Sequence, residues 1–314
     1  MTIPSQPSIG PFILTPLQVE RIWGASSLEP WFDVPETGKP IGEVWLTAAE
    51  CLIGNGPLHG KTLAAATESY PALLADKVAG GVPLLLKILF PHEKLSVQVH
   101  PNDEQARAIG EPRGKNECWY VLSAEPGASV ALGFREPITT EGIRAAIEQG
   151  TLEEKLAHVP VKAGDMVYVE AGTIHAIGPG VVILETQQYS DVTYRLFDYG
   201  RPRELHLDKG LAVTRTETGA GLVPPVTEGA RTQLVKSPYF TVDRFDVKVG
   251  QTIKLENSDR MQLLIALGDG CFVQPVSGSA AMELPKACVV VLPGEGIAYQ
   301  LAGTESAQVV RVTA

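Results

Sequence analysis

Side chains that can bind a metal ion occur in three separate segments of the chain. Gln98 and His100 are two positions apart, so in a β-strand they point to the same side. Glu117 lies in a later apolar segment, and His175 stands three residues after Gly172. Two imidazoles and one carboxylate suit a borderline divalent ion and leave a coordination position for water or substrate. The sequence therefore indicates a catalytic metal site rather than a closed structural one.

The segment 94–101, KLSVQVHP, must position the first two of these residues. Polar and aliphatic residues alternate along it, so a strand here has one polar and one aliphatic face. Ser96 shares the polar face with Gln98 and His100, and Pro101 ends the strand because it cannot donate a ladder hydrogen bond. We expect the aliphatic face to pack against a core; its members are Leu95, Val97 and Val99.

Two lysines lie next to the candidate ligands. Lys87 is the one charge inside the apolar run 81–90, and a lysine in such a run is either at a sheet edge or paired and functional. We favour the second, because the polar strand follows directly. Lys115 alternates with Glu117 in the strand-like segment 114–122, so the two point to the same side. The other histidines lie in turns or near helix ends, which favours surface or structural roles for His59, His92, His158 and His206.

Most of the remaining chain has the pattern of short strands separated by Gly and Pro turns. Short helices are expected at 61–80, with an interruption at Pro71, and from Asn102 to Gly110. Two more are expected within 137–158, with a cap at Thr139 or Thr140, and another at 207–214. The fold class is therefore mainly β.

The segment 215–232 is rich in turn residues and is the best linker candidate. We therefore expect a metal-binding domain with helical insertions at 1–220 and an all-β domain at 233–314. Residues 285–301 weakly repeat the pattern of 163–178, although short hairpins also match by chance. Ile297 stands where His175 would fall in this repeat, so we expect the C-terminal domain to bind no metal.

Bulk composition excludes several classes of protein. The 314 residues, 44% of them hydrophobic, can build one large core or two moderate ones. A net charge of −10 without a basic run argues against nucleic acid or an anionic membrane as the main partner. The four cysteines are scattered, as free thiols of a reducing compartment are, and no segment has the length of a membrane span. The expectation is a soluble cytoplasmic protein.

A known family becomes recognisable at the turn before His175. Gly164-Asp165 followed by Gly172-Thr173-Ile174-His175 resembles the second metal motif of the cupins, whose fold is a jelly roll or double-stranded β-helix. This chain has Ala171 where that motif usually has proline. Longer phrases resemble the type I mannose-6-phosphate isomerases in their short bacterial form: LLLKILF, KLSVQVHP, GKNECWYVL, AGTIHAIG and DVTYRLFDYGR.

The resemblance implies a cupin jelly roll followed by a second, degenerate cupin-like domain. It implies a zinc enzyme, with one Zn²⁺ per chain, that interconverts mannose 6-phosphate and fructose 6-phosphate. It places zinc on Gln98, His100, Glu117 and His175, makes Arg195 the active-site arginine, and puts Lys87, Ser96 and Lys115 around the substrate. Such a substrate is a sugar phosphate, whose dianion needs charge-assisted donors that an acidic protein must concentrate locally.

Aldose–ketose isomerisation moves a proton between two adjacent carbons through an enediol or enediolate, which requires an acid/base group and an oxyanion donor. The base stays open between a metal-bound hydroxide, a lysine and a carboxylate. Arg195 shares a strand face with Asp191, Thr193 and Phe197. It can clamp the phosphate, stabilise the enediolate, or form a structural ion pair with Asp191 or Asp198.

Two other functions use a similar set of residues. An iron-dependent cupin oxygenase has nearly the same ligands, but cationic side chains beside the site favour an anionic substrate instead. A non-catalytic sugar-phosphate-binding cupin would be indicated by loss of a ligand or of Arg195, and all of these are present.

Overall fold

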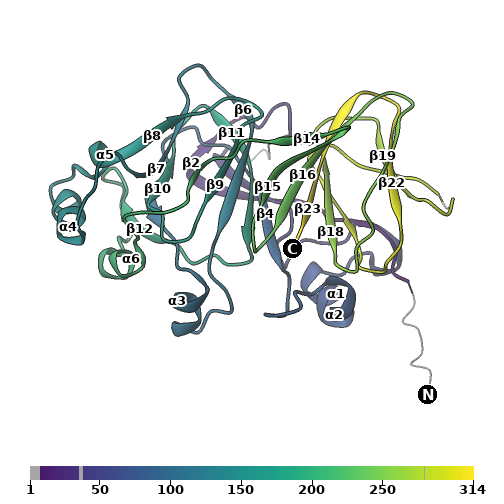
Figure 1. The fold of residues 1–314 in the computed structure, drawn as a ribbon, viewed down its shortest axis with the longest axis horizontal. Helices are drawn as coiled ribbons and strands as arrows, with labels where there is room; N and C mark the ends of the chain where they lie inside the picture. Colours follow the sequence, from purple (N-terminus) through teal and green to yellow (C-terminus); the bar gives the residue numbers. More distant parts are fainter. Residues whose placement is uncertain (1–7, 35–37, 279) are drawn as a thin grey trace. The chain divides into compact units, whose positions relative to one another are not determined.

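The chain forms short antiparallel strands with a few short helices (Figure 1). The structure, a computed structural model, describes residues 8–34, 38–278 and 280–314. They divide into two compact units. The site unit comprises the described residues of 18–45 and 84–224, and the C-terminal unit those of 1–17, 46–83 and 225–314. The boundary at 224/225 falls inside the predicted linker, whereas 46–83 lies in the C-terminal unit although the predicted division assigns it to 1–220.

Two antiparallel sheets build the site unit. Its strands are β2 (Leu17–Ala25), β3 (Ile41–Trp45), β4 (Leu84–Leu89), β5 (Val97–Val99), β6 (Glu117–Ala124), β7 (Ser129–Phe134), β8 (Leu156–Pro160), β9 (Met166–Val169), β10 (His175–Ile177), β11 (Val181–Gln188), β12 (Tyr194–Phe197) and β13 (Gly221–Leu222). One sheet has the order β12-β5-β10-β7-β8, and the other has the order β13-β9-β6-β11-β4-β3-β2.

The five-stranded sheet packs on both faces. Its inner face and the seven-stranded sheet share a hydrophobic cluster that includes Trp119, Leu132 and Ile177. Its outer face packs against helices that lie beside β7, β8, β10 and β12 (Figure 1): α4 (Thr140–Glu148), α5 (Leu152–Lys155) and α6 (Leu207–Val213). Strand alternation therefore decides which side chains face the interior between the sheets.

The outer cluster contains Val97 and Val99, as predicted for the aliphatic face of their strand. Leu95 differs, because it packs in the inner cluster. The strand begins only at Val97, so Leu95 does not follow the alternation that the sequence predicts. In β10, His175 pairs with Gln98 of β5 and with Leu132 of β7.

The predicted short helices are all present. They include α1 (Leu63–Ser69), α2 (Pro71–Leu74) and α3 (Asp103–Ala108). Asn102 caps α3 in a reciprocal capping box with Gln105, and Thr139 caps α4 through the backbone N–H of Gly142. Within the described residues, no helix is long and apolar enough to cross a membrane.

The C-terminal unit contains two further antiparallel sheets. Its strands are β1 (Phe12–Ile13), β14 (Val226–Glu228), β15 (Arg231–Lys236), β16 (Thr241–Val247), β17 (Thr252–Lys254), β18 (Gln262–Ala266), β19 (Cys271–Pro275), β20 (Met282–Glu283), β21 (Val289–Leu292), β22 (Tyr299–Gly303) and β23 (Ala307–Thr313). The sheet orders are β1-β21-β18-β23-β16-β15-β14 and β17-β22-β19-β20. Apolar side chains such as Phe245, Leu264 and Tyr299 form its core, and Ile297 packs against them. The predicted mainly β fold is confirmed.

Candidate metal centre and substrate cavity

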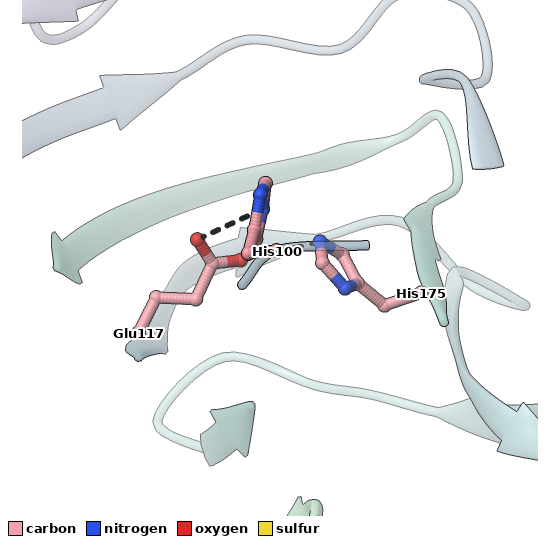
Figure 2. Close-up of side chains that lie close together, drawn as sticks. All are labelled: His100, Glu117 and His175. Carbon is pink, nitrogen blue, oxygen red and sulfur yellow. Dashed lines mark ion pairs between the residues drawn. The ribbon is translucent and has the colours of Figure 1, made fainter. Parts of the chain in front are cut away.

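His100, Glu117 and His175 converge in the interior of the site unit (Figure 2). His100 directly follows β5, Glu117 begins β6, and His175 begins β10. All three side chains are buried, and one ligand atom of each lies within 4.8 Å of the others. Glu117 spans the pair, with Oε2 at 3.5 Å from His100 Nε2 and Oε1 at 3.4 Å from His175 Nε2. The structure thus brings together three of the residues that the sequence predicts as metal ligands.

Backbone carbonyls hold both imidazoles in one tautomer. His100 Nδ1 lies 2.9 Å from the carbonyl oxygen of Val192, and His175 Nδ1 lies 2.9 Å from that of Thr173. A carbonyl only accepts, so each Nδ1 carries the proton and each Nε2 presents a lone pair to the cluster. Burial first, and then the Lys115 charge, lower the pKa of His175 to about 4, and the same two causes hold that of His100 well below its usual value.

This donor set fits a divalent cation. Two neutral imidazole nitrogens and a carboxylate face one another, and Oε1 of Glu117 is buried without a hydrogen-bond donor. A buried carboxylate oxygen without a donor is costly unless a cation meets it. Gln98 lies beside the cluster, with its Nε2 3.4 Å from His175 Nε2.

Hydrogen bonds tie the ligand-bearing segments to one another. The N–H of Gly172 donates to the carbonyl of His100 at 2.9 Å, and the N–H of Ala171 donates to Asn116 Oδ1 at 2.9 Å. Proline has no N–H, so the residue that usually precedes this glycine in cupins could not make the second bond. Gly172 itself has φ +89°, and a Cβ there would lie 2.8 Å from Arg215 Cδ. The turn therefore requires glycine at 172 and uses the N–H at 171.

Comparison with known proteins settles the family. The chain is 34% identical over 299 residues to mannose-6-phosphate isomerase ManA of Bacillus subtilis, covering 90% of this chain and 93% of that relative. It belongs to the type I phosphomannose isomerase family. The mannose-6-phosphate isomerase of Streptococcus mutans is 34% identical over 307 residues, which cover 93% and 95% of the two chains. The catalytic-domain profile of type I phosphomannose isomerase matches residues 12–132.

Solved structures agree with this family assignment. The crystal structure of the Bacillus subtilis mannose 6-phosphate isomerase superposes with a TM-score of 0.85 at 27% identity, over 96% of this chain and 99% of that one. A variant of the Salmonella typhimurium phosphomannose isomerase superposes with a TM-score of 0.78 at 16% identity, over 97% and 99% of the two chains, and shows the shared fold. This family member therefore has the cupin-type fold and a candidate metal site formed by its buried triad.

A cavity of about 490 Å³ opens beside the metal cluster. Its lining includes five of the eight site residues expected from the sequence: Lys87, Ser96, Gln98, Lys115 and Arg195. The other three are the buried triad itself. The volume lies in the range typical of small-molecule sites, about 300–1,000 Å³. All eight residues therefore lie at the cluster or in the wall of one adjoining cavity.

Lys115 is bound to the triad. Its Nζ lies 2.6 Å from Glu117 Oε2 and 3.0 Å from His100 Nε2. Burial alone would lower the pKa of Lys115, but Glu117 and more distant carboxylates outweigh it and raise the pKa. The ammonium therefore stays charged at the point where cluster and cavity meet.

Sequence reasoning missed two buried carboxylates of the cavity wall, Glu43 and Glu185. Each occupies a strand of the seven-stranded sheet, and Lys87 lies between them in β4. Lys87 Nζ lies 3.7 Å from Glu43 Oε2 and 3.8 Å from Glu185 Oε2, and Asp191 Oδ1 also lies 3.8 Å away. Period-two alternation predicts inward-facing side chains in such strands, but their partners depend on sheet register.

Glu185 differs from Glu43 in the direction of its pKa shift. Burial first, and then the charge of Glu117, raise the pKa of Glu185, against the opposing charges of Lys115 and Lys87. Trp119 Nε1 donates a hydrogen bond to Glu185 Oε1 at 3.3 Å. A buried carboxylate with a raised pKa inside a cavity is a candidate for proton transfer.

Arg195 faces the cavity without a carboxylate partner. Its Nη1 donates to the carbonyl of Glu204 at 2.9 Å, and within the described chain no carboxylate oxygen lies within 4.0 Å of its guanidinium. Asp198 instead forms ion pairs with Arg203 at 2.6 Å and with Arg201 at 3.3 Å. A structural ion pair of Arg195 with Asp198 or Asp191 is therefore not formed, and its charge remains available to an anion.

Proposed function

We propose that this enzyme interconverts mannose 6-phosphate and fructose 6-phosphate with a bound zinc ion. The observation that carries the proposal is the buried His100–Glu117–His175 cluster beside a cavity whose wall includes Lys87, Lys115 and Arg195. The relatives named mannose-6-phosphate isomerase support the sugar. Location in the cytoplasm, on this proposal, follows from the substrate and from the free cysteines of the described chain.

His100, Glu117 and His175 would hold the zinc ion, with the amide of Gln98 as a fourth and weaker ligand because it adds no charge. Bound there, zinc supplies a Lewis acid that polarises the sugar carbonyl and stabilises negative charge on its oxygen. Imidazoles held by the carbonyls of Val192 and Thr173 keep their lone pairs directed at the ion.

The protein's own side chains bind the substrate and move the proton. Lys87, Ser96 and Lys115 offer donors to the phosphate and hydroxyl groups. Glu185 is the proposed base: its carboxylate takes the proton from C2 of the aldose and returns it to C1, and its raised pKa favours both transfers. Arg195 donates to the oxygen on which negative charge develops.

A coupled assay tests this function. The protein is stripped of metal with a chelator, reloaded with Zn²⁺, and given mannose 6-phosphate, with glucose 6-phosphate as the control substrate. Formation of fructose 6-phosphate only from the mannose sugar, lost again on chelation, is the expected result. Folded, zinc-loaded protein without this activity, or substrate-dependent oxygen consumption after loading with Fe²⁺, would contradict it in favour of an oxygenase.

A further inference from the structure

Arg21 and Glu43 form a two-point ion pair in the wall of the substrate cavity. Arg21 Nε lies 3.0 Å from Glu43 Oε1, and Nη2 lies 3.2 Å from Oε2. The two residues come from the neighbouring strands β2 and β3 at the edge of the seven-stranded sheet. Two parallel N–H donors fix both the position and the orientation of a carboxylate.

Glycines allow the arginine to reach across the strands. A Cβ on Gly42 would lie 2.5 Å from Arg21 Cβ and 2.8 Å from Arg21 Cγ, so the arginine stem runs directly over this residue. A Cβ on Gly24 would lie 2.4 Å from the backbone nitrogen of Gly42. The close contact of β2 with β3 therefore places the guanidinium of Arg21 within hydrogen-bond distance of Glu43.

The Lys87 ammonium has three carboxylates as near neighbours. Glu43 Oε2 is the nearest carboxylate oxygen, at 3.7 Å, and the oxygens of Glu185 and Asp191 follow at 3.8 Å. All three lie within ion-pair range but beyond 3.5 Å, so none of them accepts a direct hydrogen bond from the ammonium. Both oxygens of Glu43 are already bound, by Arg21 and by Trp45 Nε1.

We propose that Arg21 is a positioning residue of the isomerase: it holds Glu43 beyond hydrogen-bond distance of Lys87 and so leaves the hydrogen-bond donors of Lys87 available to the sugar phosphate. This inference rests on the proposed function, because it assigns the freed ammonium to the substrate. Lys87 is buried, and a buried ammonium beside a carboxylate that has lost its own partner pairs with it. Without Arg21, Glu43 closes on Lys87 and competes with the substrate for its protons.

Steady-state kinetics on four variants test this role: Arg21→Met, Glu43→Gln, the double variant, and Lys39→Met as a matched control. Methionine keeps the stem that covers Gly42 and removes the charge. Lys39, two residues before β3, pairs with Glu20 of β2 at 2.9 Å, and both side chains are exposed, so removal of the Lys39 charge should leave the kinetics unchanged. Metal content, measured by mass spectrometry, should be equal in all variants.

Arg21→Met should raise KM for mannose 6-phosphate about tenfold while kcat changes by less than about threefold, because the Lys87 contact acts on ground and transition states alike. The double variant should return KM to within about threefold of wild type, since a neutral amide at 43 no longer competes for Lys87. Where Arg21→Met does not fold, as judged by thermal unfolding, Arg21→Gln replaces it in the same comparison.

Two outcomes overturn the inference. KM of Arg21→Met within about twofold of wild type shows that Lys87 does not depend on Arg21. A double variant whose KM is as high as that of Arg21→Met shows that Arg21 only packs β2 on β3. In that case neutralising Glu43 does not restore substrate binding. Inactivity of the wild-type protein in this assay would instead contradict the proposed function, so the two failures are distinguishable.

Discussion

Gln98 and His175 face each other as cross-strand partners of β5 and β10, with Gln98 Nε2 3.4 Å from His175 Nε2. A metal ion between these side chains requires the amide oxygen of Gln98 in place of its nitrogen, which a rotation of the amide provides. The register of two short strands thus places a fourth donor beside the triad. The same register turns Ala176, the next residue of β10, toward the helices.

Removal of a triad histidine should abolish metal binding, whereas removal of Gln98 should only weaken it. His100→Ala deletes an imidazole whose lone pair is directed at the cluster, and Gln98→Ala deletes a neutral amide that adds no charge. After chelation and reloading with Zn²⁺, mass spectrometry should find less than about a tenth of the wild-type metal in His100→Ala and more than about half in Gln98→Ala. Undiminished metal in His100→Ala would refute the site.

The C-terminal unit should bind no metal, so zinc-loaded protein should contain one ion per chain. Its core cluster is mainly apolar, the buried Asp243 is paired with Arg311, and Ile297 packs against the cluster at the position that corresponds to His175 in the predicted repeat. An apolar core offers no ligand to a divalent cation. Titration with Zn²⁺ measures the stoichiometry, and a second tight site that survives His100→Ala would contradict the prediction.

Local strand alternation explains why the sequence could place two of the candidate ligands on one face. Side chains two apart in a strand share a face, so Gln98 and His100 are linked by covalent geometry alone. The bond from the N–H of Gly172 to the carbonyl of His100 then brings the second histidine segment to the first. The glycine turn at Gly172 is a local signal, so the amino-acid sequence by itself identifies that segment.

Long-range register explains what the sequence could not show. Glu185 faces Lys87 because β11 pairs with β4, and it faces Trp119 because β11 also pairs with β6. No residue near Glu185 in the chain encodes either pairing. The placement of residues 46–83 in the C-terminal unit likewise depends on contacts with segments more than a hundred residues away.

Metal-free protein should lose stability as the pH falls from about 6.5 to about 4. The pKa of His175 is lowered to about 4 in the folded state, mainly by burial, whereas in the unfolded chain it is near 6.5. Between these values the unfolded state binds the extra proton, so the free energy of unfolding decreases with decreasing pH, by about 3 kcal/mol for this residue. His100, lowered for the same reason, acts in the same direction.

Urea unfolding of chelated protein at several pH values within this window measures the effect. His175→Gln should flatten the dependence, because it removes one buried group that must stay neutral. The matched control is His158→Gln, which removes an exposed histidine and should leave the slope unchanged. A stability of the chelated wild type that does not change across the window would show that the imidazoles are not held neutral in the fold.

Arg195→Ala should slow catalysis strongly while metal binding and folding persist. The guanidinium has no carboxylate partner within 4.0 Å in the described chain, so its removal leaves no buried carboxylate unpaired. On the proposed function, Lys87, Ser96 and Lys115 would provide donors for the phosphate, and the developing enediolate oxygen would need one more donor besides the metal. Loss of one such donor costs about 2.7–4 kcal/mol, or about a hundredfold to a thousandfold in kcat.

Kinetics on Arg195→Ala separate the possible roles of this residue. A fall in kcat with metal retained indicates work in the transition state, and a rise in KM alone indicates a phosphate clamp. Arg144→Ala is the matched control, because Arg144 forms an exposed ion pair with Asp208 at 2.8 Å outside the cavity lining. If neither kcat nor KM changes in Arg195→Ala, the arginine takes no part in substrate binding or in the reaction, and its role is structural.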